Sequence, residues 1–148
     1  MEASQHIEPA NTDCGQGAAI VLLHGFPFNR TMWREQIEFL SVHNFRVLAP
    51  DLRGLGENKS DDEVATMEDM ARDIAVLMDR LKIDRATICG LSMGCYVAFE
   101  FVHLFPARVR APILRFLSIA EHGQDLSTGY LCSDVENPID PCLNKLYK

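Results

Sequence analysis

The sequence lacks the features that would direct it to a membrane, to a nucleic acid or to an oxidising compartment. No apolar run reaches the roughly 20 residues that span a bilayer, and the first residues have neither the basic nor the apolar region of a secretory signal peptide. Basic residues are outnumbered, 14 Lys and Arg against 21 Asp and Glu, which gives a net charge of −7. A basic patch is absent as well, so we expect a cytoplasmic protein with neither nucleic acid nor a membrane as partner.

The cysteines give no sign of a disulfide framework or of a metal site. They number five, are scattered along the chain, and lack the spacing of metal ligands. We therefore expect reduced thiols and no bound metal. The 148 residues, 47% hydrophobic and 24% charged, are enough for one globular domain with a real core. Without an internal repeat or a low-complexity linker, residues 1–148 are predicted to form a single domain with a polar lead-in at 1–17.

Short apolar runs alternate with helical patterns along the first hundred residues. A continuous apolar run typical of a buried parallel strand occupies residues 18–23, and short, mostly apolar strand patterns occupy 45–49 and 85–89. Helix-spaced apolar residues occupy 31–42 and 67–81, and the second stretch is preceded by a capping box from Thr66 to Asp69, with Asp in place of Glu. This order predicts an α/β fold with a mostly parallel, doubly wound sheet and helices on both faces.

The segment Gly90-Leu91-Ser92-Met93-Gly94 joins the third apolar run to a helical stretch that begins near Tyr96 and ends before Pro106. A Gly-x-Ser-x-Gly sequence between a strand and a helix predicts a very tight turn that lifts the serine hydroxyl above the sheet edge. The helix N-terminus would then favour an oxyanion at that place. The alternative is a glycine-rich turn whose serine only caps the helix, but the context favours a nucleophile.

Two further loops follow the first and second apolar runs. Gly25 lets the chain turn so that the Phe26 N–H can point inward, at the sheet edge where open α/β sheets bind ligands. His24 is expected to hold this loop by hydrogen bonds rather than to act as a base. In the second loop, Asp51 and Arg53 are predicted to pair and brace the floor of the site, with binding of an acidic substrate as the alternative.

These motifs resemble those of a known family. Three occur in the family's order: His24-Gly25-Phe26-Pro27, Asp51-Leu52-Arg53-Gly54-Leu55-Gly56 and Gly90-Leu91-Ser92-Met93-Gly94. Residues 18–114 thereby resemble the N-terminal half of an α/β-hydrolase, and are most similar to the small cofactor-free esterases, enol-lactonases and haloperoxidase-like hydrolases. The resemblance implies no cofactor and an oxyanion hole formed by the backbone N–H groups of Phe26 and Met93. It also implies a site lined by His24, Gly25, Asp51 and Cys95; the family often has a glycine where Cys95 stands.

After residue 114 the resemblance implies a compact, shortened α/β-hydrolase fold without a lid domain. Residues 116–125 resemble the family's acid-bearing strand and loop, and residues 129–131 its histidine loop, with Tyr130 at the histidine position. The C-terminal part, 115–148, is short for the family. We therefore expect exposed apolar surface to be covered by association into a homo-oligomer, a dimer or larger.

A serine nucleophile needs a base, and the base needs an orienting acid. Only His103 and His122 follow Ser92, and His103 lies eleven residues on, three helical turns from the hydroxyl. His122, in a loop after a strand, is the predicted base, although it could be a surface histidine. Asp125 is the predicted orienting acid, and the alternatives are Glu121, Asp134 and Asp140.

Together these residues predict a serine carboxylic-ester hydrolase that acts on small, short-chain esters through an acyl-enzyme. One alternative is a remnant of the fold that has lost its base and serves as a binding or interaction protein. Another is lactone hydrolysis or perhydrolysis at the same site, because one fold and one triad support many chemistries.

Overall fold

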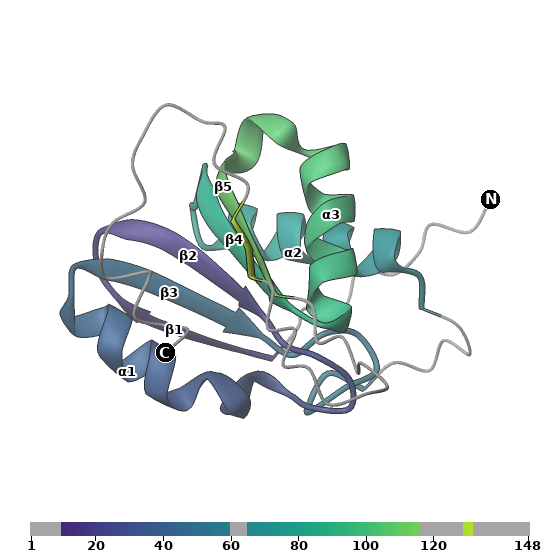
Figure 1. Cartoon of the computed structure of the whole chain (residues 1–148), viewed down its shortest axis with the longest axis horizontal. Helices are drawn as coiled ribbons and strands as arrows, with labels where there is room; N and C mark the ends of the chain where they lie inside the picture. Colours follow the sequence, from purple (N-terminus) through teal and green to yellow (C-terminus); the bar gives the residue numbers. More distant parts are fainter. Residues whose placement is uncertain (1–9, 60–64, 116–128, 132–148) are drawn as a thin grey trace.

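The structure is a computed structural model that describes residues 10–59, 65–115 and 129–131. Over these residues six strands form one sheet in the order β1-β3-β2-β4-β5-β6 (Figure 1). The central strands β3, β2, β4 and β5 are parallel, whereas β1 and β6 are antiparallel to their neighbours. The strands are β1 (Asn11–Gly15), β2 (Ala18–Leu23), β3 (Phe45–Pro50), β4 (Ala86–Leu91), β5 (Val109–Arg115) and β6 (Gly129–Leu131).

Helices cover both faces of this sheet, so the predicted α/β fold is confirmed. They are η1 (Arg30–Trp33), α1 (Arg34–Val42), α2 (Met67–Arg80), α3 (Met93–Leu104) and η2 (Pro106–Arg108). Figure 1 shows α1 on one side of the sheet and α2 and α3 on the other. No helix among the described residues has the length and apolar character needed to cross a bilayer.

Strand β2 illustrates why the central strands are apolar throughout. Val21 and Leu23 belong to the buried cluster under α2 and α3, while Ile20 and Leu22 belong to the cluster under α1. A strand covered on both faces has no side chain left for water, and so its sequence is a continuous apolar run instead of an alternating one.

Strand β1 forms from part of the polar lead-in, where the sequence predicted no strand. Its five residues pair antiparallel with β3 at the sheet edge, and its last three are exposed. The chain then passes around the start of β3 to reach β2. This path requires Gly15 and Gly17, because both have positive φ and a side chain on either would run into the backbone carbonyl of Phe45 or Asn44.

Strand β6 corrects a prediction. Residues 129–131, which resembled the family's histidine loop, form a strand antiparallel to β5, with Tyr130 opposite Leu114. The last three residues of β5 are thereby paired along the edge of the sheet that would otherwise be open. The predicted loop is therefore wrong for these three residues.

The predicted capping box at the start of α2 is confirmed. The Asp69 N–H donates to Thr66 Oγ1 at 3.1 Å, and the Thr66 N–H donates to Asp69 Oδ2 at 3.0 Å. Hydrogen bonds from Thr66 hold the pKa of the Asp69 carboxyl below its usual value. The box fixes the start of a helix whose buried face packs on the sheet and on α3.

Replacing Thr66 with Ala should therefore lower the free energy of unfolding by about 1 kcal/mol, because it removes the hydroxyl that accepts the Asp69 N–H. Thr66→Ser keeps that hydroxyl and should lose much less. Urea denaturation of the two variants beside the parent chain measures both values. Equal losses would mean that packing of the threonine methyl group, and not the cap, is what the helix requires.

Candidate active site

The ends of β2 and β4 form the place in the sheet where a ligand site is expected. From β2 the chain moves through α1 to β3 on one side, and from β4 it moves through α3 to β5 on the other. Loops that leave two neighbouring strands in opposite directions open a crevice at their carboxyl ends. The segment that begins at His24 follows β2, and Ser92 follows β4.

Ser92 lies in the tight turn that the sequence predicts between β4 and α3. Its φ of 52° and ψ of −114° are unusual for a residue other than glycine. A side chain at Gly90 would strike the backbone of Gly94, and one at Gly94 would strike the carbonyl of Leu23. Strand and helix therefore approach so closely that only glycine fits on either side of the serine.

The Ser92 side chain is partly exposed and makes no capping hydrogen bond to α3. This finding argues against the alternative in which the serine serves only as a helix cap. Its hydroxyl lies beside the first turn of α3, whose backbone N–H groups lack intrahelical partners. Met93 is the first residue of that helix, so its N–H is one of these donors.

The loop of residues 24–30 lies directly against the Ser92 turn. A side-chain carbon added at Gly25 would come within 3.3 Å of Ser92 Cβ and 3.2 Å of the Leu91 carbonyl oxygen. The Phe28 N–H donates to the Gly25 carbonyl at 2.9 Å, which closes a turn around Phe26. The structure thus brings Gly25 and Ser92 together, while the oxyanion hole of Phe26 and Met93 stays a prediction.

His24 is fully buried and both of its ring nitrogens are in use. The Leu52 N–H donates to Nε2 at 2.9 Å, so the ring proton is on Nδ1, which lies 3.0 Å from the Gly25 carbonyl oxygen and donates to it. Burial lowers the pKa of this imidazole, although the bond to Gly25 and the charge of Asp51 oppose that shift. A neutral ring with both nitrogens occupied holds the loop and has no free nitrogen for the Ser92 proton.

The predicted ion pair between Asp51 and Arg53 is wrong. The Asp51 carboxylate accepts the Arg30 N–H at 2.8 Å and pairs with the Arg30 guanidinium. Arg53 instead makes a two-pronged pair with Asp73 on α2, at 2.8 and 2.6 Å. Each residue finds a partner about 20 positions away in the chain, and such a separation cannot be recognised in the local sequence.

Cys95 is fully buried in the core cluster under α2 and α3. Its thiol donates to the Gly90 carbonyl at 3.1 Å. The sulfur therefore packs beneath the Ser92 turn, in the interior, and is closed off from water.

The predicted base and acid lie outside the described residues: His122, Asp125 and the alternatives Glu121, Asp134 and Asp140. Of the described histidines, His43 follows α1 near the start of β3, and His103 is near the end of α3, roughly 16 Å along the helix from Ser92. Both positions are toward the opposite edge of the sheet, so neither histidine lies at Ser92. The base for Ser92 therefore stays a prediction. The described part of the chain contains no group of three His, Cys, Asp or Glu residues placed to hold a metal ion.

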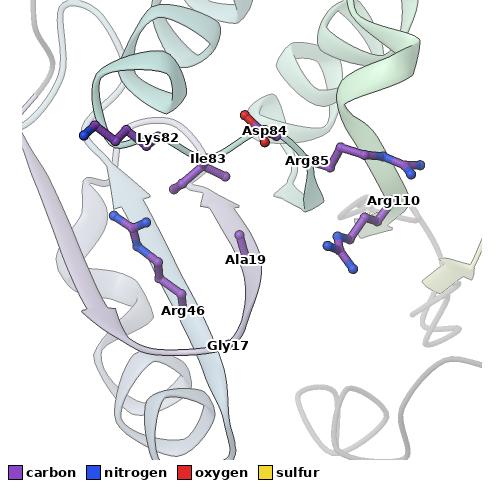
Figure 2. A pocket seen from close by; sticks show the side chains of 8 residues that line it. All are labelled: Gly17, Ala19, Arg46, Lys82, Ile83, Asp84, Arg85 and Arg110. Carbon is purple, nitrogen blue, oxygen red and sulfur yellow. The ribbon is translucent and has the colours of Figure 1, made fainter.

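A pocket of about 340 Å³ lies at that opposite edge, where the parallel strands begin (Figure 2). Its charged residues include Arg46, which bonds Asp13 and the Leu81 carbonyl, and Arg85, which bonds the Val109 carbonyl. The hydrogen bonds of these two arginines therefore hold the ends of strands and of α2 in place. The lining consists of Gly17, Ala19, Arg46, Lys82, Ile83, Asp84, Arg85 and Arg110.

Comparisons with known proteins agree with this arrangement. Residues 18–115 match the family described as alpha/beta hydrolase fold. Over 99 residues the chain is 37% identical to "Epoxide hydrolase 2" of Siraitia grosvenorii, a match that covers 66% of this chain and 31% of that protein.

Two solved structures are similar in both sequence and fold. One is a thermophilic esterase from Thermogutta terrifontis, 47% identical with a TM-score of 0.69, covering 71% of this chain and 39% of the esterase. The other, Est816, is described as an N-acyl homoserine lactone degrading enzyme and is 29% identical with a TM-score of 0.69, covering 72% of this chain and 40% of Est816. The chain thus spans about a third to two fifths of the length of these relatives.

The buried neutral state of His24 predicts that stability falls in mild acid. A histidine whose folded pKa is lowered contributes stability that is complete above its ordinary value of 6.5 and is lost as the pH falls from there toward the folded value. Protonation also removes the Nε2 acceptor of the Leu52 N–H. As the pH falls below 6.5, the free energy of unfolding in urea should fall more steeply for the parent chain than for His24→Asn, which cannot be protonated. Parallel pH profiles for the two chains would contradict this account of His24.

Proposed function

Because the chain belongs to the α/β-hydrolase fold family, we propose that it is a serine hydrolase that cleaves small carboxylic esters through an acyl-enzyme on Ser92. The observation that carries the proposal is the Ser92 turn. The side chain is partly exposed, is not used to cap α3, and stands beside Gly25 at the carboxyl ends of β2 and β4. The 47% identity to an esterase supports an ester as the substrate.

In the proposed reaction, Ser92 Oγ adds to the ester carbonyl carbon while His122 accepts the hydroxyl proton and Asp125 orients the imidazole. The N–H groups of Phe26 and Met93 donate to the oxyanion of the tetrahedral intermediate, and the positive end of the α3 dipole adds to this stabilisation. The alcohol leaves with the proton from His122. A water molecule, activated by the same histidine, then hydrolyses the acyl-enzyme and regenerates Ser92.

A hydroxyl nucleophile favours esters over the epoxides that the Siraitia relative's name indicates. Attack of Ser92 on a carbonyl gives an ester, which an activated water can cleave. Attack of Ser92 on an epoxide carbon would give an ether, which water cannot readily cleave, so the site would be blocked after one event. Epoxide opening through a covalent intermediate would call for a carboxylate at this position.

Lactone hydrolysis is a second candidate, because a lactone is a cyclic ester and passes through the same steps. The likeness to Est816 favours it. In that case the alcohol stays tethered to the acyl group and leaves with it when water attacks.

Replacing Ser92 with Ala should abolish both p-nitrophenyl acetate hydrolysis and labelling by a fluorophosphonate, since both require the Oγ atom. Ser41→Ala is the matched control, because Ser41 is on α1 and its hydroxyl donates to the Glu38 carbonyl. Thermal unfolding should be similar in the two variants. Near-normal turnover in Ser92→Ala would exclude Ser92 as nucleophile, whereas a parent chain with neither label nor turnover would favour the binding-protein alternative.

The proposed oxyanion hole predicts that the Phe26 N–H matters more than its ring, which is largely exposed. Phe26→Ala keeps the N–H and should retain most of kcat, while Phe26→Pro deletes it and should lose on the order of a hundredfold. Stopped-flow ester hydrolysis gives kcat, and circular dichroism checks that both variants are folded. Equal losses would argue that the ring is needed and the amide is not.

A further inference from the structure

The loop of residues 24–30 is fastened at both ends to the segment 51–58 that follows β3. At the first end, His24 Nε2 accepts the Leu52 N–H. At the second end, the N–H and the guanidinium of Arg30 bind the Asp51 carboxylate. Residues 25–29, which include Phe26, lie between these two attachments.

Asp51 is bonded to the neighbouring segments through both its side chain and its backbone. It is fully buried, and its Oδ2 accepts the Glu57 N–H at 2.9 Å in addition to its bonds with Arg30. Its own N–H donates to the Ala10 carbonyl at 2.7 Å, and its carbonyl accepts the Asn58 side-chain amide at 3.1 Å. A carboxylate with charge-assisted bonds on both oxygens is a rigid anchor. Because its oxygens are occupied and buried, it is not placed to bind a substrate or to move a proton.

The inner part of the loop has no comparable anchor of its own. Gly25, the residue in contact with the Ser92 turn, has no side chain to fix that contact. The hydrogen bonds to the Gly25 carbonyl, from the Phe28 N–H and from His24 Nδ1, come from within the loop and do not tie residues 25–29 to another segment. The placement of the Phe26 N–H relative to Ser92 therefore depends on the two ends.

We propose that Asp51 is a positioning residue for the reaction: through Arg30 it sets the end of the loop that places the Phe26 N–H over Ser92. The proposal rests on the function proposed above. Donors to an oxyanion act only when they are held within about 0.5 Å of the productive position. Releasing the loop at one end should therefore lower kcat more than it weakens substrate binding.

Asp73 provides a matched control for a test of Asp51. It too is a buried carboxylate that accepts two bonds from an arginine, and its partner Arg53 belongs to the same segment 51–58. It lies on α2, and its bonds to Arg53 do not reach the loop of residues 24–30. Asp51→Asn and Asp73→Asn each remove a buried charge and leave an arginine with a weaker partner, so both should lower Tm.

Only Asp51→Asn should change catalysis. We expect kcat for p-nitrophenyl acetate to fall about tenfold or more with KM nearly unchanged, and the affinity for a trifluoromethyl ketone analogue to fall by the same factor. Asp73→Asn should keep both values near those of the parent chain. Arg30→Lys should retain a higher kcat than Arg30→Met, because it keeps a cation beside Asp51. These two variants still test the proposal if Asp51→Asn fails to fold. Equal effects of Asp51→Asn and Asp73→Asn on kcat, or equal activity of the two Arg30 variants, would overturn the proposal.

Amide hydrogen exchange separates this proposal from the proposed function. In Asp51→Asn the Phe26 and Phe28 amides should exchange faster than in Asp73→Asn, whether or not the chain turns over an ester. Unchanged exchange in Asp51→Asn would overturn the positioning role by itself. The parent chain could fail to turn over an ester while Asp51→Asn still speeds exchange of the loop amides. That result would overturn the ester-hydrolase function and leave the structural link between Asp51 and the loop intact.

Discussion

Close approach of three backbone segments around Ser92 is the constraint on which the rest of the structure depends. The start of α3 lies on the end of β2 at Gly94, and the loop after β2 lies on the Ser92 turn at Gly25. At Gly94 no side chain larger than hydrogen fits, and at Gly25 an added carbon would press on the Ser92 turn. Ser92 itself has a positive φ, which for a residue with a side chain costs on the order of 1–3 kcal/mol. Apolar clusters on both faces of the sheet hold the flanking elements and so maintain that strained turn.

Buried charges add a second level of organisation. The segment 51–58 carries both Asp51, which binds the loop of residues 24–30, and Arg53, which binds α2. Buried ion pairs often add little to stability, because the cost of removing charges from water offsets much of their attraction. Here the pairs fix geometry: one pair holds two loops together, and the other holds a loop to a helix. The segment thereby connects the helix layer to the edge of the sheet where Ser92 lies.

The sequence predicted the central strands, the helices and the Ser92 turn because each has a local signature. Apolar continuity marks β2, helical spacing marks α2, and Gly-x-Ser-x-Gly in its strand–turn–helix context marks the turn. The two outer strands have no such signature, since β1 is polar and half exposed and β6 has only three residues. Their existence depends on backbone pairing with a neighbour, which composition does not encode.

Within the candidate site, the structure changes the partners that the sequence assigned. Asp51 and Arg53 were predicted to pair with each other, but each pairs with a residue far away in the chain. His24 was expected to hold its loop, and the structure gives it hydrogen bonds to Leu52 and Gly25. His122 and Asp125 lie outside the described residues, so the base and the acid still rest on the resemblance and on loop position alone.

Trapping the acyl-enzyme that we propose on Ser92 is the sharpest single test of the proposed function. The chain is mixed with p-nitrophenyl acetate, quenched in acid within the first turnover, digested, and sequenced by tandem mass spectrometry. If Ser92 is the nucleophile, an acetyl group should be found on the Ser92 side chain, and it should disappear when the quench is delayed until the substrate is consumed. Ester turnover with no acetyl group on Ser92, or with the acetyl group on another residue, would contradict it.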